Sequence, residues 1–152
     1  MSARMSRHTM QLREVTLTEI QMKRLSDVPE TPPAVSTKVE SRGEIVSDQA
    51  GYAFVRITLV FDEAENAPFS LTAEYRGTVV TEDQPVNREK FETFLKDEGV
   101  YLLWPYLRQL IAQLTRDMDF PPLTLPTLSH TKEIIDRNEA AVDAVKGDIS
   151  GE

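Results

Sequence analysis

The sequence predicts an α+β protein, in which a four-stranded antiparallel meander sheet is backed by a long helix and a C-terminal helix. Two observations carry this prediction. Apolar and polar residues alternate along four segments in the first part of the chain, and apolar residues then recur with the period of an amphipathic helix. Short polar turns separate the alternating segments, which is typical of antiparallel strands with one buried face.

The first two strands are predicted over residues 9–24 and 34–46. The first segment is rich in threonine, which disfavours a helix, although its spaced charges leave a helix as the alternative. Its alternation changes phase between Leu12 and Val15, so we expect a bulge there. A proline-marked turn leads to the second segment, in which Gly43 is expected to bend or end the strand.

The third and fourth strands are predicted over residues 52–62 and 69–80. Each segment carries an apolar face opposite a polar one. The residues expected to face inward are Ala53, Val55, Ile57, Leu59, Phe61, Phe69, Leu71, Ala73, Tyr75 and Val79.

The second half of the chain is predicted to be mainly helical. Asn87 caps a short helix over residues 88–97 that Gly99 closes, and a longer helix begins near Trp104 with Pro105 in its first turn. The long helix has an apolar stripe made of Leu103, Leu107, Leu110, Ile111, Leu114 and Met118. This stripe is wide for a helix that covers one sheet, so part of it is expected to meet a second copy of the chain.

An apolar, proline-rich segment follows the long helix at residues 120–128. Its prolines prevent a helix, and its apolar side chains must lie on a hydrophobic surface or expose one for use. Residues 129–146 are predicted to form a polar final helix. We expect residues 9–146 to form one domain, between a disordered arm at 1–8 and a flexible tail at 147–152.

Composition excludes several classes of function. The chain has no cysteine, two histidines and six scattered glycines, which leaves no disulfide frame, thiolate nucleophile, multi-histidine metal cage or glycine-rich phosphate loop. We therefore expect no enzyme, metal or cofactor. The net charge of −8 disfavours nucleic-acid binding. No apolar run approaches the ~20 residues that span a bilayer, and residues 1–10 lack the core of a signal peptide, so we expect a cytoplasmic protein without membrane insertion.

Two motifs resemble the SecB family of bacterial chaperones. The similarity lies in the stretch LWPYLR at residues 103–108, where that family's long helix begins, and in the stretch FPPLTL at residues 120–125. The order of the predicted elements fits as well. The resemblance implies a SecB-like fold and a homotetramer built as a dimer of dimers. It also implies that unfolded client polypeptides are held in apolar grooves without ATP or metal.

The resemblance further implies roles for particular residues. Client binding is implied for Val35, Val39, Phe120, Leu123, Leu125, Leu128, Ile134 and Ile135, and the oligomer interface for Tyr106, Leu107, Leu110 and Leu114. In this family the motor protein SecA docks on acidic residues of the outward sheet face, and Glu19 stands at one such position. Lys23 and Thr72 stand at two others, where acids are expected, which disfavours SecA as a partner.

Three functions remain open at this point. The first is an ATP-independent holdase for secretory precursors, and the second is a dedicated chaperone that protects the antitoxin of a toxin–antitoxin system. The third is an oligomeric interaction module without client binding, whose apolar surfaces are fully buried between subunits. The acidic composition suits the first two, because charge repulsion keeps a protein with exposed apolar surface soluble.

Overall fold

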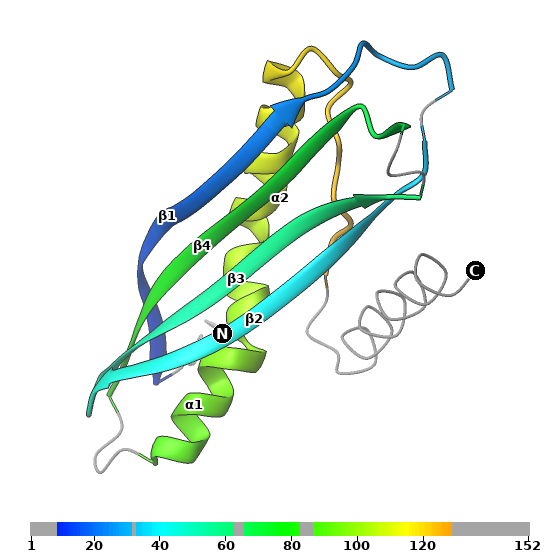
Figure 1. Cartoon of the computed structure of the whole chain (residues 1–152). Helices are drawn as coiled ribbons and strands as arrows, with labels where there is room; N and C mark the ends of the chain where they lie inside the picture. The colour runs from blue at the N-terminus through cyan, green and yellow to red at the C-terminus, as the bar shows by residue number, and fades with distance from the viewer. Residues whose placement is uncertain (1–8, 32, 63–65, 83–86, 129–152) are drawn as a thin grey trace, which may run out of the picture.

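The computed structural model describes residues 9–31, 33–62, 66–82 and 87–128. Its elements are the strands β1 (Met10–Arg24), β2 (Val35–Ser47), β3 (Ala50–Phe61) and β4 (Phe69–Thr81), followed by the helices α1 (Arg88–Asp97) and α2 (Gly99–Asp117). The strands form one antiparallel sheet, and both helices cover the same face of it (Figure 1). The predicted α+β fold, with four antiparallel strands backed by a long helix, is therefore confirmed.

The strand order is β1-β4-β3-β2, which corrects the predicted meander at one strand. β2, β3 and β4 follow one another as predicted, whereas β1 pairs with β4 at the far edge of the sheet. The tight turn at residues 48–49 holds β2 against β3, while the longer connection at 25–34 allows β1 and β2 to lie apart. The chain between them passes from one edge of the sheet to the other (Figure 1).

Two register shifts keep the apolar side chains of β1 on the helix-covered face. They lie between Leu12 and Glu14 and between Leu17 and Glu19. The first is the bulge predicted from the phase change after Leu12. In a regular strand, a one-residue change in the phase of the alternation would turn every following side chain to the opposite face. The two shifts compensate for these changes in phase, so the apolar side chains of β1 stay on one face.

The hydrophobic core lies between the sheet and the two helices. All the residues predicted to face inward on β3 and β4 are buried, except Tyr75, which is partly buried. The helices contribute the buried side chains of Phe91, Leu95, Leu103, Trp104, Leu107 and Ile111. Burial of each large apolar side chain contributes about 1.5–3 kcal/mol, so this contact holds the helices on the sheet.

Gly43 and Gly99 allow the helices to approach the sheet closely. Gly43 lies inside β2 rather than ending it, and a Cβ atom there would stand 2.7 Å from Cβ of Leu95 on α1. Gly99 is the first residue of α2 rather than the end of α1, and a Cβ atom there would stand 2.8 Å from Cβ of Ala53. Both glycines are needed because a side chain there would prevent close packing of the helices on the sheet. The sequence alone does not distinguish this role from that of a glycine that ends a helix or a strand.

α2 begins at Gly99, earlier than the predicted start near Trp104. Pro105 therefore lies inside the helix rather than in its first turn, at a position where proline removes one main-chain hydrogen bond. The side chains of Leu103, Trp104 and Leu107 are buried on either side of it, and this burial offsets the local cost.

The segment after α2, residues 119–128, is called the strap here. The chain leaves the helix at Asp119, whose φ of 67° lies in the left-handed region, and continues without helix or strand, as its prolines predict. The strap runs back beside α2 on the helix-covered side of the sheet (Figure 1).

The predicted final helix at 129–146, the arm at 1–8 and the tail at 147–152 lie outside the described residues, so the predicted domain limits stay predictions. In the part of the chain that the structure covers, no helix combines the length and the apolar character that crossing a membrane requires.

Candidate functional site

Thr115 holds the first half of the strap against α2. Its side chain is fully buried, and Oγ1 accepts a hydrogen bond from the amide of Leu123 at 2.9 Å. The same hydroxyl donates to the carbonyl of Ile111 at 2.8 Å, one turn earlier in the helix. The hydroxyl thus donates and accepts, which explains how a polar side chain is accommodated inside the apolar stripe.

Arg108 and Trp104 hold the second half of the strap. Nε of Arg108 donates to the carbonyl of Leu125 at 2.9 Å, and Nε1 of Trp104 donates to the carbonyl of Pro126 at 2.6 Å. The acceptors of both hydrogen bonds are main-chain carbonyl oxygens of the strap. The two bonds therefore require an extended main chain and do not depend on the side chains of the strap.

Phe120 and Leu125 are the strap residues that enter the core, with exposed fractions of 7% and 2%. The ring centroid of Phe120 lies 5.1 Å from that of Phe69 on β4. The guanidinium carbon of Arg24 lies 5.3 Å from the Phe120 centroid, and Nε of Arg24 donates to the carbonyl of Met118 at 3.0 Å. The start of the strap is thus held by β1 as well as by α2.

The predicted client-binding residues divide into two groups and a remainder. Val35, Val39, Leu123 and Leu128 are partly buried and pack against the core from its margin. Phe120 and Leu125 are core residues, so a client reaches them only when the strap moves. Ile134 and Ile135 lie outside the described residues. The client-binding role of all eight stays a prediction, and the first group offers apolar surface without any rearrangement.

A second apolar surface lies on β1, and the sequence did not indicate it. Leu17, Ile20 and Met22 are on the helix-covered face at the edge of the sheet, yet they are 40%, 40% and 42% exposed. Tyr106 of α2 is 42% exposed, and its ring centroid lies 6.1 Å from that of Tyr75. Burial raises the pKa of Tyr75, which favours its neutral form here. The irregular spacing of the three β1 residues across a bulge hides the surface in the sequence.

The predicted oligomer-interface residues are not equally accessible. Tyr106 is exposed and Leu110 is partly buried, whereas Leu107 and Leu114 are buried in the core of the protomer. In this arrangement only Tyr106 and Leu110 present surface to a second copy. The interface role of all four residues stays a prediction.

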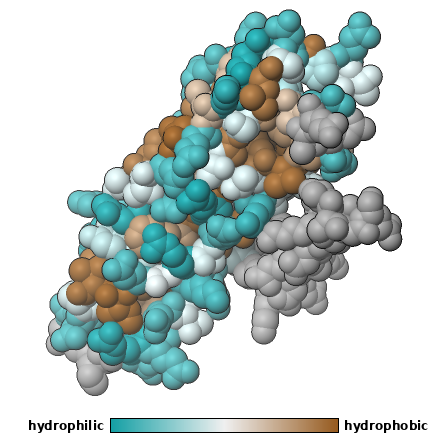
Figure 2. Space-filling model, viewed as in Figure 1, coloured by the Kyte–Doolittle hydropathy of each residue, from teal (hydrophilic) through white to brown (hydrophobic). Residues whose placement is uncertain are grey.

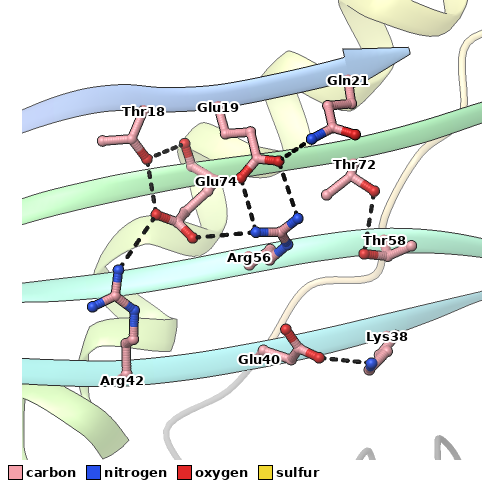
Figure 3. A network of polar contacts seen from close by, with 10 residues as sticks. All are labelled: Thr18, Glu19, Gln21, Lys38, Glu40, Arg42, Arg56, Thr58, Thr72 and Glu74. Carbon is pink, nitrogen blue, oxygen red and sulfur yellow. Dashed lines mark hydrogen bonds and ion pairs between the residues drawn. The ribbon is translucent and has the colours of Figure 1, made fainter. Parts of the chain in front are cut away.

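The sheet face turned away from the helices carries a charged network that spans all four strands (Figure 3). Arg56 on β3 donates to both carboxylate oxygens of Glu19 on β1, at 2.8 and 3.0 Å. Glu74 on β4 accepts a hydrogen bond from the Thr18 hydroxyl at 3.0 Å. Its carboxylate oxygens lie 3.9 Å from the guanidinium of Arg42 on β2 and 4.0 Å from that of Arg56. Each of the two carboxylates is therefore matched by guanidinium groups.

Glu19, the predicted docking acid, lies on this outward face as expected, but its charge is already paired. The amide of Gln21 also donates to it, at 2.6 Å. Thr72 donates to the hydroxyl of Thr58 at 3.4 Å, and Lys23 is exposed. From this side the surface is mostly hydrophilic, with separate hydrophobic patches (Figure 2). Paired acids and an added lysine weaken the attraction for a basic partner, and docking at Glu19 stays a prediction.

Within the described ranges, no three histidine, aspartate or glutamate side chains come together as a metal site. The groups that the structure does assemble are apolar side chains at the margin of the core and donors directed at main-chain carbonyls. This chemistry suits non-covalent binding of an extended polypeptide.

Comparison with known proteins adds a family. The model of the family described as preprotein translocase subunit SecB matches residues 2–132. A protein-export protein SecB from Cereibacter sphaeroides is 37% identical over 60 residues, which cover 40% of this chain and 35% of that protein. A protein-export protein SecB from Roseobacter denitrificans is 29% identical over 87 residues, or 57% of this chain and 50% of that protein. The chain thus matches half or less of the length of these curated relatives.

Solved structures share the fold. A SecB-like chaperone of Mycobacterium tuberculosis, in complex with a peptide from the HigA1 antitoxin, aligns with a TM-score of 0.68 at 19% identity, covering 80% of this chain and 91% of that chain. A protein of unknown function from Streptococcus agalactiae aligns with a TM-score of 0.52 at 12% identity, covering 77% and 96% of the two chains.

Proposed function

Because the chain belongs to the SecB family, we propose that it is an ATP-independent holdase chaperone, which binds unfolded polypeptides for protein export and keeps them from folding or aggregating. The observation that carries the proposal is the apolar surface at the margin of the core, made by Val35, Val39, Leu123 and Leu128. Its partial exposure gives unfolded segments an apolar binding surface. The family also supports the cytoplasm as the place of action and a function that is not enzymatic.

The edge of the sheet at β2 supports the same function. Within the described part of the chain β2 pairs only with β3, so half of its main-chain groups point away from the sheet. An extended client that lies along β2 can bond to these groups while its side chains contact Val35 and Val39. Main-chain bonding with apolar contact gives the broad selectivity that a holdase needs.

A dedicated antitoxin chaperone is the second candidate, favoured by the charge pattern of the outward sheet face. Glu19 is paired with Arg56, and Lys23 and Thr72 replace acids, so this face attracts a basic motor protein weakly. The structural neighbour from Mycobacterium tuberculosis holds an antitoxin peptide, which supports a client of this class. An interaction module without client binding is the remaining alternative.

The proposed assembly is a homotetramer, as a dimer of dimers. β1 is the other edge of the sheet, and its exposed Leu17, Ile20 and Met22 lie on the same face as Tyr106. Strand pairing between two β1 edges, together with burial of these side chains, supports a dimer.

Suppression of aggregation by matched variants tests the proposed function. We expect the protein to reduce light scattering from a reduced, unfolded client, and Val39→Asp to weaken this effect at least tenfold, because a carboxylate replaces apolar contact. Val46→Asp is the control, since Val46 lies on the same strand but is 54% exposed near the β2–β3 turn. Wild-type protein that binds neither this client nor an antitoxin would leave the interaction module as the better description.

A further inference from the structure

The strap is bound to α2 in the manner of a separate peptide. It has no helix or strand of its own, and α2 holds its main chain through the amide of Leu123 and the carbonyls of Leu125 and Pro126. Every extended polypeptide offers main-chain groups of this kind. The donors and the acceptor on α2 are therefore not specific to the strap sequence.

The side chains of the strap complete this mode of binding. Phe120 and Leu125 occupy apolar sites against the core, while Leu123 and Leu128 stay partly exposed. The main-chain bonds constrain the sequence at one position only: the residue in place of Leu123 must carry an N–H, because Thr115 accepts from it. Proline is tolerated at the carbonyl positions, as Pro126 demonstrates.

We propose that α2 and the core beneath the strap form a binding site for an extended apolar segment of a client, and that the strap occupies this site until a client replaces it. This inference rests on the proposed holdase function and adds a location and a selectivity to it. The preferred segment carries an aromatic residue in place of Phe120 and an aliphatic residue in place of Leu125, with a non-proline residue in place of Leu123.

Replacement of the strap by a client explains how the client can occupy the apolar sites that Phe120 and Leu125 fill in the protomer. A client that replaces the strap buries an equivalent apolar area and remakes the three bonds to Trp104, Arg108 and Thr115, so the loss of strap contacts is offset. A client that binds beside the strap contacts the marginal surface of Val35, Val39, Leu123 and Leu128, whereas a client that replaces the strap takes the place of Leu123 and Leu128 and still contacts Val35 and Val39. The strap is tethered, so its high effective concentration prevents weak segments from displacing it and restricts the site to strongly apolar ones.

Hydrogen–deuterium exchange of the full-length protein tests the proposal. The probe is an unfolded, fluorescently labelled client whose binding is first established by anisotropy. Client binding should speed exchange in peptides that cover residues 119–128 at least tenfold, because the Leu123 amide loses Thr115 as its acceptor, and exchange in β3 should not change. Unchanged or slower strap exchange with the client bound would overturn the inference and leave the holdase function intact.

The affinity of strap variants for the labelled client is a second, independent test of the proposal. Leu125→Ser weakens the strap without altering the residues of α2 that bind it, so the labelled client should bind at least threefold more tightly. Thr124→Ser is the control, because Thr124 is exposed. If Leu125 were a contact residue for the client, the variant would bind more weakly and the inference would fail. The hydrogen exchange of residues 119–128 could instead depend on the protein concentration and not on the client. That result would show that the strap of a second copy occupies the site, and it would also overturn the inference.

If the client does not bind to the wild type at all, the proposed holdase function is contradicted. If the client binds but the strap stays in place, only the inference about the strap is contradicted, so the two outcomes are distinguishable.

Discussion

At the scale of single residues, polar groups inside apolar surroundings carry the most information. Thr115 is fully buried in the stripe of α2, where its hydroxyl joins the helix to the strap. On the other face of the sheet, Arg56 of β3 donates to Glu19 of β1, two strands that lie apart in sequence. Neither contact was foreseen, since a sequence does not reveal which distant residue will satisfy a buried donor or acceptor.

Replacement of Thr115 by valine should destabilise the protein by about 1–3 kcal/mol, because the shape is kept while the Leu123 amide loses its acceptor. The free energy of unfolding in urea measures this change. The control Thr93→Val, at an exposed position on α1, should stay within about 0.5 kcal/mol of the wild type. Equal effects of the two substitutions would contradict the role of Thr115.

At the scale of elements, the strands and the helical pattern were predictable, and their ends were not. The alternation along β3 and β4 identified their inward residues correctly, and the phase change in β1 indicated its first bulge. The start of α2 was wrong because Gly99 and Pro105 resemble helix boundaries. Both lie inside one helix here, since packing against the sheet outweighs local propensity.

Gly43→Ala should destabilise the contact between α1 and β2 by about 1–3 kcal/mol, because the new Cβ atom would lie 2.7 Å from Cβ of Leu95. Leu95→Gly alone should cost about 3–6 kcal/mol, because it opens a cavity and also places a glycine inside a helix. The double variant should lose less than the sum of the two single losses, since glycine at position 95 removes the Cβ atom that the added methyl group would meet. Additive losses in thermal or urea unfolding would show that the two positions do not meet.

At the scale of the whole molecule, the described residues leave two sheet edges and two apolar surfaces open. In the proposed function and assembly, β2 with the margin of the core binds clients, and β1 with Tyr106 meets a second copy. The excess of 25 acidic over 17 basic residues keeps such a molecule soluble through charge repulsion.

Ile20→Lys should dissociate the proposed tetramer, because a charge replaces an apolar side chain at the β1 edge that is 40% exposed in the protomer. Size-exclusion chromatography with light scattering measures the mass. Gln21→Lys is the matched control, with the same new residue on the opposite face of the same strand. A wild-type monomer, or equal dissociation of both variants, would argue against an interface at this surface.

The sequence by itself determined the elements, the α+β class, the extended course of the strap and the family, because these depend on local periodicity, proline positions and short motifs. Only the tertiary structure decided the order of β1 beside β4 and the extent of α2. It also decided that Phe120 and Leu125 are buried while Leu17, Ile20 and Met22 are exposed. Whether an apolar side chain is covered depends on which distant elements pack against it, and that information exists only once the chain has folded.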